Sequence, residues 1–197
     1  PDFDLDAEDS DIDIISTENN ATIEKYKIQE VIKKGQILLV QATKEERGNK
    51  GASLTTYISL AGKYCVLMPN KPSQNGISRK IANVGERKRL RNIINNLTTD
   101  RDNNSIIVRT AGAGHSSLDI KRDYEYLSTL WNKIRETTLQ STAPSFIHQE
   151  DGIILKAVRD LLDKNVHEVL VQGEEAYANC LRFVNDMTPN ERSIVKE

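Results

Sequence analysis

A short apolar segment, a glycine-rich loop and a long amphipathic helix follow one another in the middle of this chain. Residues 105–108 (SIIV) predict a short strand, because three of the four are apolar and β-branched. Ser116 and Asp119 have the spacing of a capping box that begins a helix. This helix carries an apolar stripe, in which we expect Trp131 to lie in the core, formed by Ile120, Tyr124, Leu127, Trp131 and Ile134. The succession predicts a mixed fold of the α+β or α/β class.

The elements before and after this centre are shorter. Residues 28–32 fit either a short helix or a strand. Strands are predicted over residues 36–43, 54–60 and 64–68, with a charged turn at 44–53, and this arrangement suggests part of a small barrel. We expect a loop over residues 69–78 and a helix over 86–97. The final third predicts one α/β unit that lacks the further strands a sheet requires, from a helix over 154–162, a strand over 166–171 and a helix over 174–187.

Charge is distributed unevenly along the chain. Nine of the 29 acidic residues lie within residues 1–24, which contain no Lys or Arg, so the remaining 173 residues hold 20 acidic and 27 basic residues. Residues 1–24 have little continuous apolar surface and are interpreted as a disordered or inserted acidic lead. The basic remainder fits a polyanion-binding domain, or equally a solvated surface beside an acidic tail.

Several classes of protein are excluded or disfavoured. No apolar run reaches the roughly 18 residues of a membrane span, and no signal peptide is visible. Cys65 and Cys180 lie too far apart for a metal motif, and a cytosolic, reducing location is expected. The chain's histidines are widely separated and indicate no nucleophilic site: His115, His148 and His167.

Two segments are candidates for binding anions. Arg109 precedes a loop containing Gly112 and Gly114, and such a loop before a helix can bind phosphate, although a plain turn explains it as well. The basic loop over residues 44–51 suits the backbone of single-stranded nucleic acid, or it is an ordinary hairpin turn. A third basic loop at residues 76–80 is ambiguous.

A series of motifs resembles the ribonuclease E/G family, and the residues of these motifs are closer to those of the E branch. They cover roughly residues 26–187 in order and comprise residues 44–52 (KEERGNKGA), 54–56 (LTT), 58–62 (ISLAG), 66–70 (VLMPN), 76–79 (GISR), 108–112 (VRTAG) and 147–150 (IHQE).

The resemblance implies a bacterial endoribonuclease that cleaves single-stranded, AU-rich RNA in mRNA decay and in rRNA and tRNA processing. It implies an acidic insertion over residues 1–23 and the second half of an OB-fold RNA-binding domain over 24–56. It further implies a 5′ sensor domain over 57–153 and the start of a ribonuclease-H-like domain over 154–197. The partner would be single-stranded RNA. The parent protein would be cytoplasmic, with possible peripheral membrane association and degradosome partners, and would assemble as a tetramer.

Site residues carry over only where the motifs match. Arg109 and Thr110 match the pair that grips a terminal 5′-phosphate, and Gly62 and Val66 match positions whose backbone lines that pocket. The resemblance implies RNA contacts for Arg79 and for the OB-fold residue Lys50.

Other family features have no counterpart in this sequence. The Mg²⁺ ligands, the catalytic residues and the zinc-link motif are expected outside the chain, so we assign it no catalytic or metal-binding residue. His115 stands where many relatives carry Lys. A non-catalytic RNA-binding module, or a protein-interaction domain with a basic face, would also fit.

Overall fold

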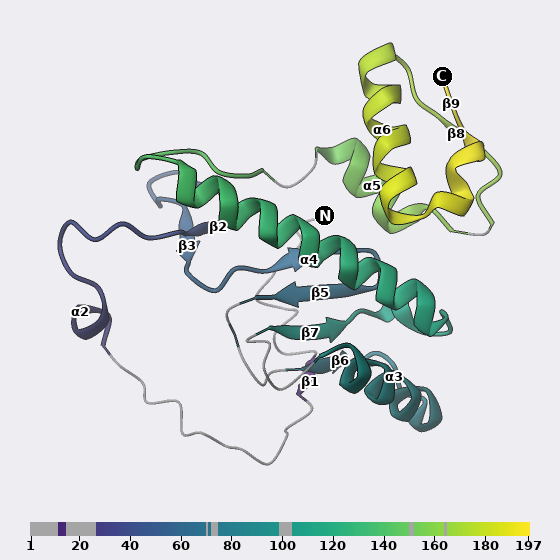
Figure 1. The fold of residues 1–197 in the computed structure, drawn as a ribbon, viewed down its shortest axis with the longest axis horizontal. Helices are drawn as coiled ribbons and strands as arrows, with labels where there is room; N and C mark the ends of the chain where they lie inside the picture. The colour runs from purple at the N-terminus through teal and green to yellow at the C-terminus, as the bar shows by residue number, and fades with distance from the viewer. Residues whose placement is uncertain are drawn as a thin grey trace.

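A mixed five-stranded sheet with two helices on one face forms the centre of the molecule (Figure 1). The computed structural model describes residues 12–14, 27–69, 71, 75–98, 104–149, 152–163 and 165–197. The strand order is β1 (Ile12–Ile14), β6 (Gly76–Ser78), β7 (Ser105–Val108), β5 (Cys65–Met68) and β4 (Leu60–Ala61). Neighbouring strands are antiparallel, except that β6 and β7 are parallel.

The two faces of this sheet have different roles. Helices α3 (Val84–Leu97) and α4 (Ser117–Gln140) pack on the same face, where the side chains of β5 and β7 are fully buried. These side chains are Cys65, Leu67, Ile106 and Val108. Because side chains alternate along a strand, the register partners Val66 and Ile107 belong to the opposite face.

Helix α4 begins where the sequence predicts. The Ser116 hydroxyl accepts a hydrogen bond from the Asp119 backbone N–H, and the Asp119 carboxylate accepts one from the Ser116 N–H, which confirms the capping box. Ile120, Leu127 and Ile134 are buried. Trp131, predicted to lie in the core, is half-buried and packs against its margin.

Helix α3 begins two residues before the predicted start. The Asn83 side chain is its N-cap and accepts a hydrogen bond from the Glu86 N–H at 2.9 Å. Three apolar side chains of this helix pack against β6 and β7: Leu90, Ile93 and Ile94.

The region before β4 differs from the predicted long strands. Residues 28–32 contain the short helix α2 (Ile28–Val31), and residues 36–43 contribute only the start of β2 (Gln41–Lys44). The strand predicted over 54–60 is divided into β3 (Ser53–Thr55) and β4. Between the two strands, the side-chain amide of Gln41 bonds to both the N–H and the C=O of Ser59 and links β2 to the segment just before β4.

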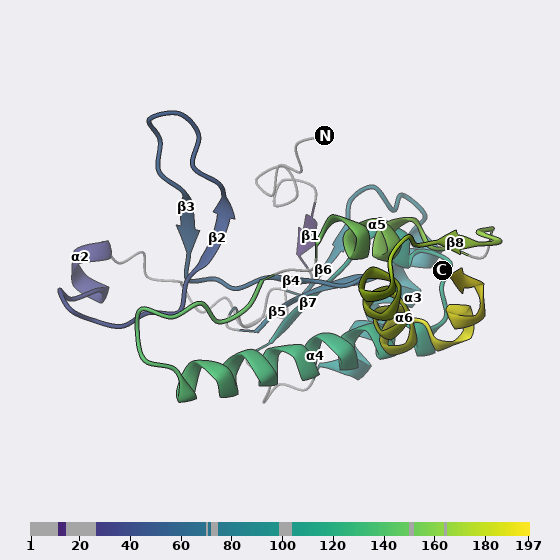
Figure 2. The same ribbon diagram turned by 90° about the horizontal axis from the view of Figure 1, so that it is seen from above.

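Strands β2 and β3 form an antiparallel hairpin that projects away from the sheet (Figure 2). The hairpin turn predicted around residues 44–53 is confirmed, with Arg47 and Lys50 paired through their backbones and Gly48 at a positive φ of 59°. No sheet within the described ranges closes into a barrel.

Two segments that were predicted to be irregular contain strands. The loop predicted over residues 69–78 ends in strand β6, because residues 76–78 pair with both β1 and β7. The acidic lead contributes β1 at the sheet edge, so residues 12–14 are ordered by backbone pairing despite their charge. The rest of the predicted acidic lead lies outside the described residues.

A smaller unit follows α4. It contains α5 (Ile153–Leu161), β8 (Val169–Leu170), α6 (Glu174–Met187), the 3₁₀ helix η2 (Pro189–Ile194) and β9 (Val195–Lys196). The expectation that this unit lacks a partner strand is wrong, because β9 pairs in parallel with β8. None of the helices described has the length and apolar character needed to cross a membrane.

Candidate anion-binding site at the ends of β6 and β7

Arg109 directly follows β7, at the edge where the parallel strands β6 and β7 both end. Ile77 of β6 pairs with Val108 of β7. The backbone therefore leaves both strands at the same edge of the sheet, after β6 toward Arg79 and after β7 toward Arg109. The fold therefore brings two predicted site segments, separated by about thirty residues in the sequence, to one edge of the sheet.

The Arg109 guanidinium is fixed through one of its nitrogens. Its Nη1 donates to the Gly62 carbonyl oxygen at 2.7 Å and to Asp160 Oδ1 at 2.9 Å, with a longer contact of 3.5 Å to the Lys63 oxygen. Nε and Nη2 have no hydrogen-bond partner within the part of the chain that is described. The guanidinium thus keeps one complete edge of donors for a ligand.

The carboxylate of Asp160 lies between two arginines. Arg159 donates from Nε to Oδ1 and from Nη2 to Oδ2, both at 3.1 Å, while Arg109 approaches Oδ1 alone. Burial disfavours the charged carboxylate, but the hydrogen bonds from Arg159 and Arg109 outweigh it and lower the pKa of Asp160. Asp160 therefore stays ionised beside the candidate site.

Asp123 of α4 organises the turn between β4 and β5 that contacts Arg109. Its carboxylate accepts backbone N–H bonds from Lys63 at 3.0 Å, Tyr64 at 2.8 Å and Cys65 at 2.9 Å. Burial raises the pKa of Asp123, and these bonds offset the rise in part. The turn is held so closely that a Cβ on Gly62 would lie 2.6 Å from Asp123 Oδ1.

The glycine loop after Arg109 is anchored at both ends. Gly112, in the 3₁₀ helix η1 (Thr110–Gly112), packs so tightly that a Cβ there would lie 2.8 Å from Val108 Cγ1 and 3.0 Å from the Tyr64 oxygen. Gly114 has a φ of 75° and donates its N–H to Glu86 at the start of α3. Hydrogen bonds from Arg89 and then from Gly114 lower the pKa of Glu86 to about 2.

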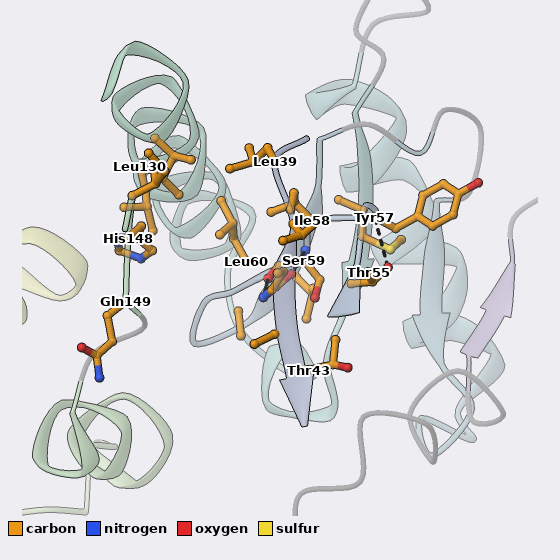
Figure 3. A pocket seen from close by; sticks show the side chains of 18 of the residues that line it. Leu39, Thr43, Thr55, Tyr57, Ile58, Ser59, Leu60, Leu130, His148 and Gln149 are labelled. Atoms are coloured by element: carbon orange, nitrogen blue, oxygen red, sulfur yellow. Dashed lines mark hydrogen bonds between the residues drawn. The ribbon is translucent and has the colours of Figure 1, made fainter. Parts of the chain in front are cut away.

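Arg109 and Thr110 line a groove of about 1780 Å³ that also reaches Val66 on the open face of the sheet. Thr110 is exposed, and its hydroxyl has no partner among the described residues. One wall of the groove is formed by residues 36–43 and by residues 57–61, which follow the hairpin. Another wall is formed by α4 and residues 141–149 (Figure 3). The groove therefore connects the hairpin stem with the end of β7.

The remaining sequence-predicted residues lie around this site. The Gly62 carbonyl touches Arg109, but its N–H is already bonded to the Cys65 oxygen at 2.8 Å. Arg79 is exposed in the turn after β6 and is absent from the groove lining. Lys50 is exposed in the turn of the β2–β3 hairpin and is absent from the groove lining.

Sequence reasoning missed two acidic residues that organise the site. Asp160 lies 51 residues after Arg109, in a segment assigned to another domain, and no local pattern links the two. The position of Asp123 could have been predicted from the helical pattern. It lies three residues after Ile120 and four before Leu127, which places it on the apolar side of the helix. A buried acid in that position needs donors, and the β4–β5 turn supplies them.

The described residues form no metal site. They contain no group of three or more His, Cys, Asp or Glu side chains placed to hold a metal ion. The Mg²⁺ implied by the sequence resemblance thus finds no ligand set among them, and we derive no chemical step through a metal for this chain.

Comparison with known proteins identifies the class to which this arrangement belongs. The model of the Ribonuclease E/G family matches residues 59–197, which is more than half of the chain. The chain belongs to the ribonuclease E/G family.

Individual relatives agree with this assignment. Ribonuclease E of Haemophilus influenzae is 39% identical over 163 residues, which are 83% of this chain and 17% of that protein. Ribonuclease E of Escherichia coli is 43% identical over 74% of this chain and 14% of its own length, and ribonuclease G of the same organism is 30% identical over 82% and 32%. The chain thus spans about a third or less of these relatives.

Proposed function

We propose that this chain is the RNA-recognition portion of a ribonuclease E-type endoribonuclease and that it senses a 5′-monophosphate. The parent enzyme would cleave single-stranded, AU-rich RNA in mRNA decay and in rRNA and tRNA processing. The Mg²⁺ ligands of the parent enzyme would come from segments other than the described residues. The parent enzyme would also assemble as a tetramer and bind degradosome proteins.

The domain assignment is part of this proposal. The hairpin β2–β3 would belong to the closing half of an OB-fold over residues 24–56. The sheet with α3 and α4 would be the 5′ sensor over 57–153, and the unit from α5 to β9 would begin a ribonuclease-H-like domain over 154–197. The groove that joins the hairpin stem to Arg109 supports an RNA path between the first two.

The observation that carries the proposal is the free edge of Arg109. Nε and Nη2 together match two oxygens of a phosphate, and the exposed Thr110 hydroxyl adds a neutral donor beside them. A terminal monophosphate presents three oxygens and a charge of about −1.5 to −2 near neutral pH. Gly62 and Val66 would shape the pocket, while Arg79 and Lys50 would contact RNA elsewhere.

Arg109→Ala in the full-length protein tests the proposal. One oligonucleotide with a 5′-monophosphate, a 5′-triphosphate or a 5′-hydroxyl is compared by dissociation constant at fixed salt. We expect the wild type to prefer the monophosphate and Arg109→Ala to lose most of that preference, because a hydrogen bond to a charged group contributes about 1.5–3 kcal/mol. Arg109→Lys should restore it only in part, since an ammonium cannot reproduce the fork.

Arg135→Ala is the matched control. Arg135 is exposed on α4 outside the groove lining, so its loss removes the same charge from another surface. It should leave the monophosphate preference unchanged. A preference that survives Arg109→Ala, or one that Arg135→Ala reduces equally, would show that Arg109 does not form the phosphate site.

A further inference from the structure

We propose that Asp160 is a positioning residue of the phosphate site, which holds the Arg109 guanidinium by Nη1 so that its other edge meets the 5′-phosphate. The inference rests on the proposed function and extends it to a residue of α5 that the sequence motifs do not include. It makes the unit after α4 part of 5′-end recognition.

The use of donors on Arg109 supports this role. A guanidinium has five N–H groups, of which two are on Nη1. Those two are directed to the Gly62 oxygen at 2.7 Å and to Asp160 Oδ1 at 2.9 Å, which fixes the plane of the group. The side chain of Arg109 is 18% exposed, and its Nε–Nη2 edge, with no partner among the described residues, is the edge suited to bidentate phosphate binding.

The opposite role for Asp160, an internal anion that competes with phosphate, fits the geometry less well. A competing carboxylate would place both oxygens on the Nε–Nη2 edge of Arg109. Asp160 instead directs both oxygens to the Nε and Nη2 groups of Arg159, and only Oδ1 reaches Arg109. The three groups together carry a net charge of +1, so the site still attracts an anion.

Arg159 fixes Asp160 to the sheet. Its Nη1 donates to the carbonyl oxygen of Ala61 in β4 at 3.1 Å, and its side chain is only 11% exposed. The carbonyl oxygens of Ala61 and Gly62, adjacent in the chain, therefore accept from Arg159 and Arg109 respectively. Through this pair of contacts, α5 is placed where Asp160 can orient Arg109, and a shift of α5 would release it.

The experiment measures the ratio of dissociation constants for 5′-hydroxyl and 5′-monophosphate forms of one single-stranded oligonucleotide, in the full-length protein at fixed salt. Asp160→Asn should lower this preference about threefold to tenfold and leave the affinity for the 5′-hydroxyl form unchanged. In an Arg109→Ala background, Asp160→Asn should change the preference no further, because it acts only through Arg109.

Asp186→Asn provides the matched control, because Asp186 is exposed on α6 and its carboxylate has no partner among the described residues. If Asp160→Asn lowers the melting temperature strongly, Asp160→Glu, which keeps the charge, is measured in its place and should give a smaller loss in the same direction.

The outcomes separate the inference from the proposed function. A monophosphate preference that rises in Asp160→Asn would identify Asp160 as a competitor, and an unchanged preference would make it only a structural contact; either result overturns the inference. A preference that survives Arg109→Ala would overturn the proposed function itself.

Discussion

Gly62 is the position in the candidate site where the backbone and a buried carboxylate come closest. A Cβ there would lie 2.6 Å from Asp123 Oδ1, and the same carboxylate holds three backbone N–H groups of the turn. Gly62→Ala should therefore lower the free energy of unfolding by about 1–3 kcal/mol, the usual cost of inserting an extra group into a well-packed site. Urea unfolding of both proteins, monitored by circular dichroism, measures this change in the free energy of unfolding.

Gly51→Ala is the control for this substitution. Gly51 lies in the turn region before β3, a Cβ there would meet no atom within 4 Å, and its φ is outside the left-handed region. It should change stability by less than about 0.5 kcal/mol. Equal effects of the two substitutions would show that the contact with Asp123 does not restrict Gly62.

Among the elements, α3 and the glycine loop are coupled through Glu86. This carboxylate accepts a bidentate pair of bonds from Arg89, at 2.6 and 2.9 Å, and the Gly114 N–H at 2.9 Å. These bonds, in that order of importance, lower the pKa of Glu86 from 4.5 to about 2. A carboxyl whose pKa is lower in the folded protein stabilises it above its unfolded pKa, and this contribution is lost as the pH falls toward the folded pKa.

We therefore expect the melting temperature of the wild type to exceed that of Glu86→Gln at about pH 6, and the difference to disappear as the pH falls from 4.5 to about 2. Thermal melts of both proteins across this range test it. Glu136→Gln, at an exposed position of α4, should follow the wild type at every pH. A constant difference between wild type and Glu86→Gln would contradict the ionic role of Glu86.

Local sequence signals predicted the elements that depend on local interactions. The capping box at Ser116 and the strands β5 and β7 were visible because their caps and apolar runs lie within a few residues. Strand β6 was missed, because a three-residue strand next to Asn75 becomes a strand only by pairing with distant partners. The same reason applies to the site, where the loop containing Arg109 was found and its partner Asp160 was not.

At the scale of the whole molecule, the unit after α4 is fixed to the sheet unit by a few specific contacts. Tyr126 of α4 meets Phe183 of α6 edge to face at 6.5 Å, Asp160 bonds to Arg109, and Lys63 lies 3.5 Å from Glu191 of η2. Two of these three contacts involve the β4–β5 turn or its partner Arg109. The position of the second unit and the geometry of the candidate site are therefore linked.

The ion pair of Lys63 and Glu191 gives a prediction about this link. The Lys63 side chain is 8% exposed and that of Glu191 is 22% exposed, and neither Lys63 Nζ nor Glu191 Oε2 has a hydrogen bond within the described structure. Glu191→Gln leaves a buried ammonium without its counter-charge and should lower the free energy of unfolding by about 1–3 kcal/mol. Lys63→Met leaves the Glu191 carboxylate unpaired, and because that carboxylate is the more exposed partner, the loss of free energy of unfolding should be smaller.

The double variant Lys63→Met/Glu191→Gln should be more stable than Glu191→Gln alone, because replacing the charged lysine by an apolar side chain of similar length removes the buried charge that the single change leaves unpaired. Urea unfolding of the two single variants and the double variant gives the coupling free energy between the positions. Strictly additive costs would mean that the two charges do not interact, and that the second unit is held in place by its other contacts with the sheet unit, which include Tyr126–Phe183, Arg109–Asp160 and Arg159–Ala61.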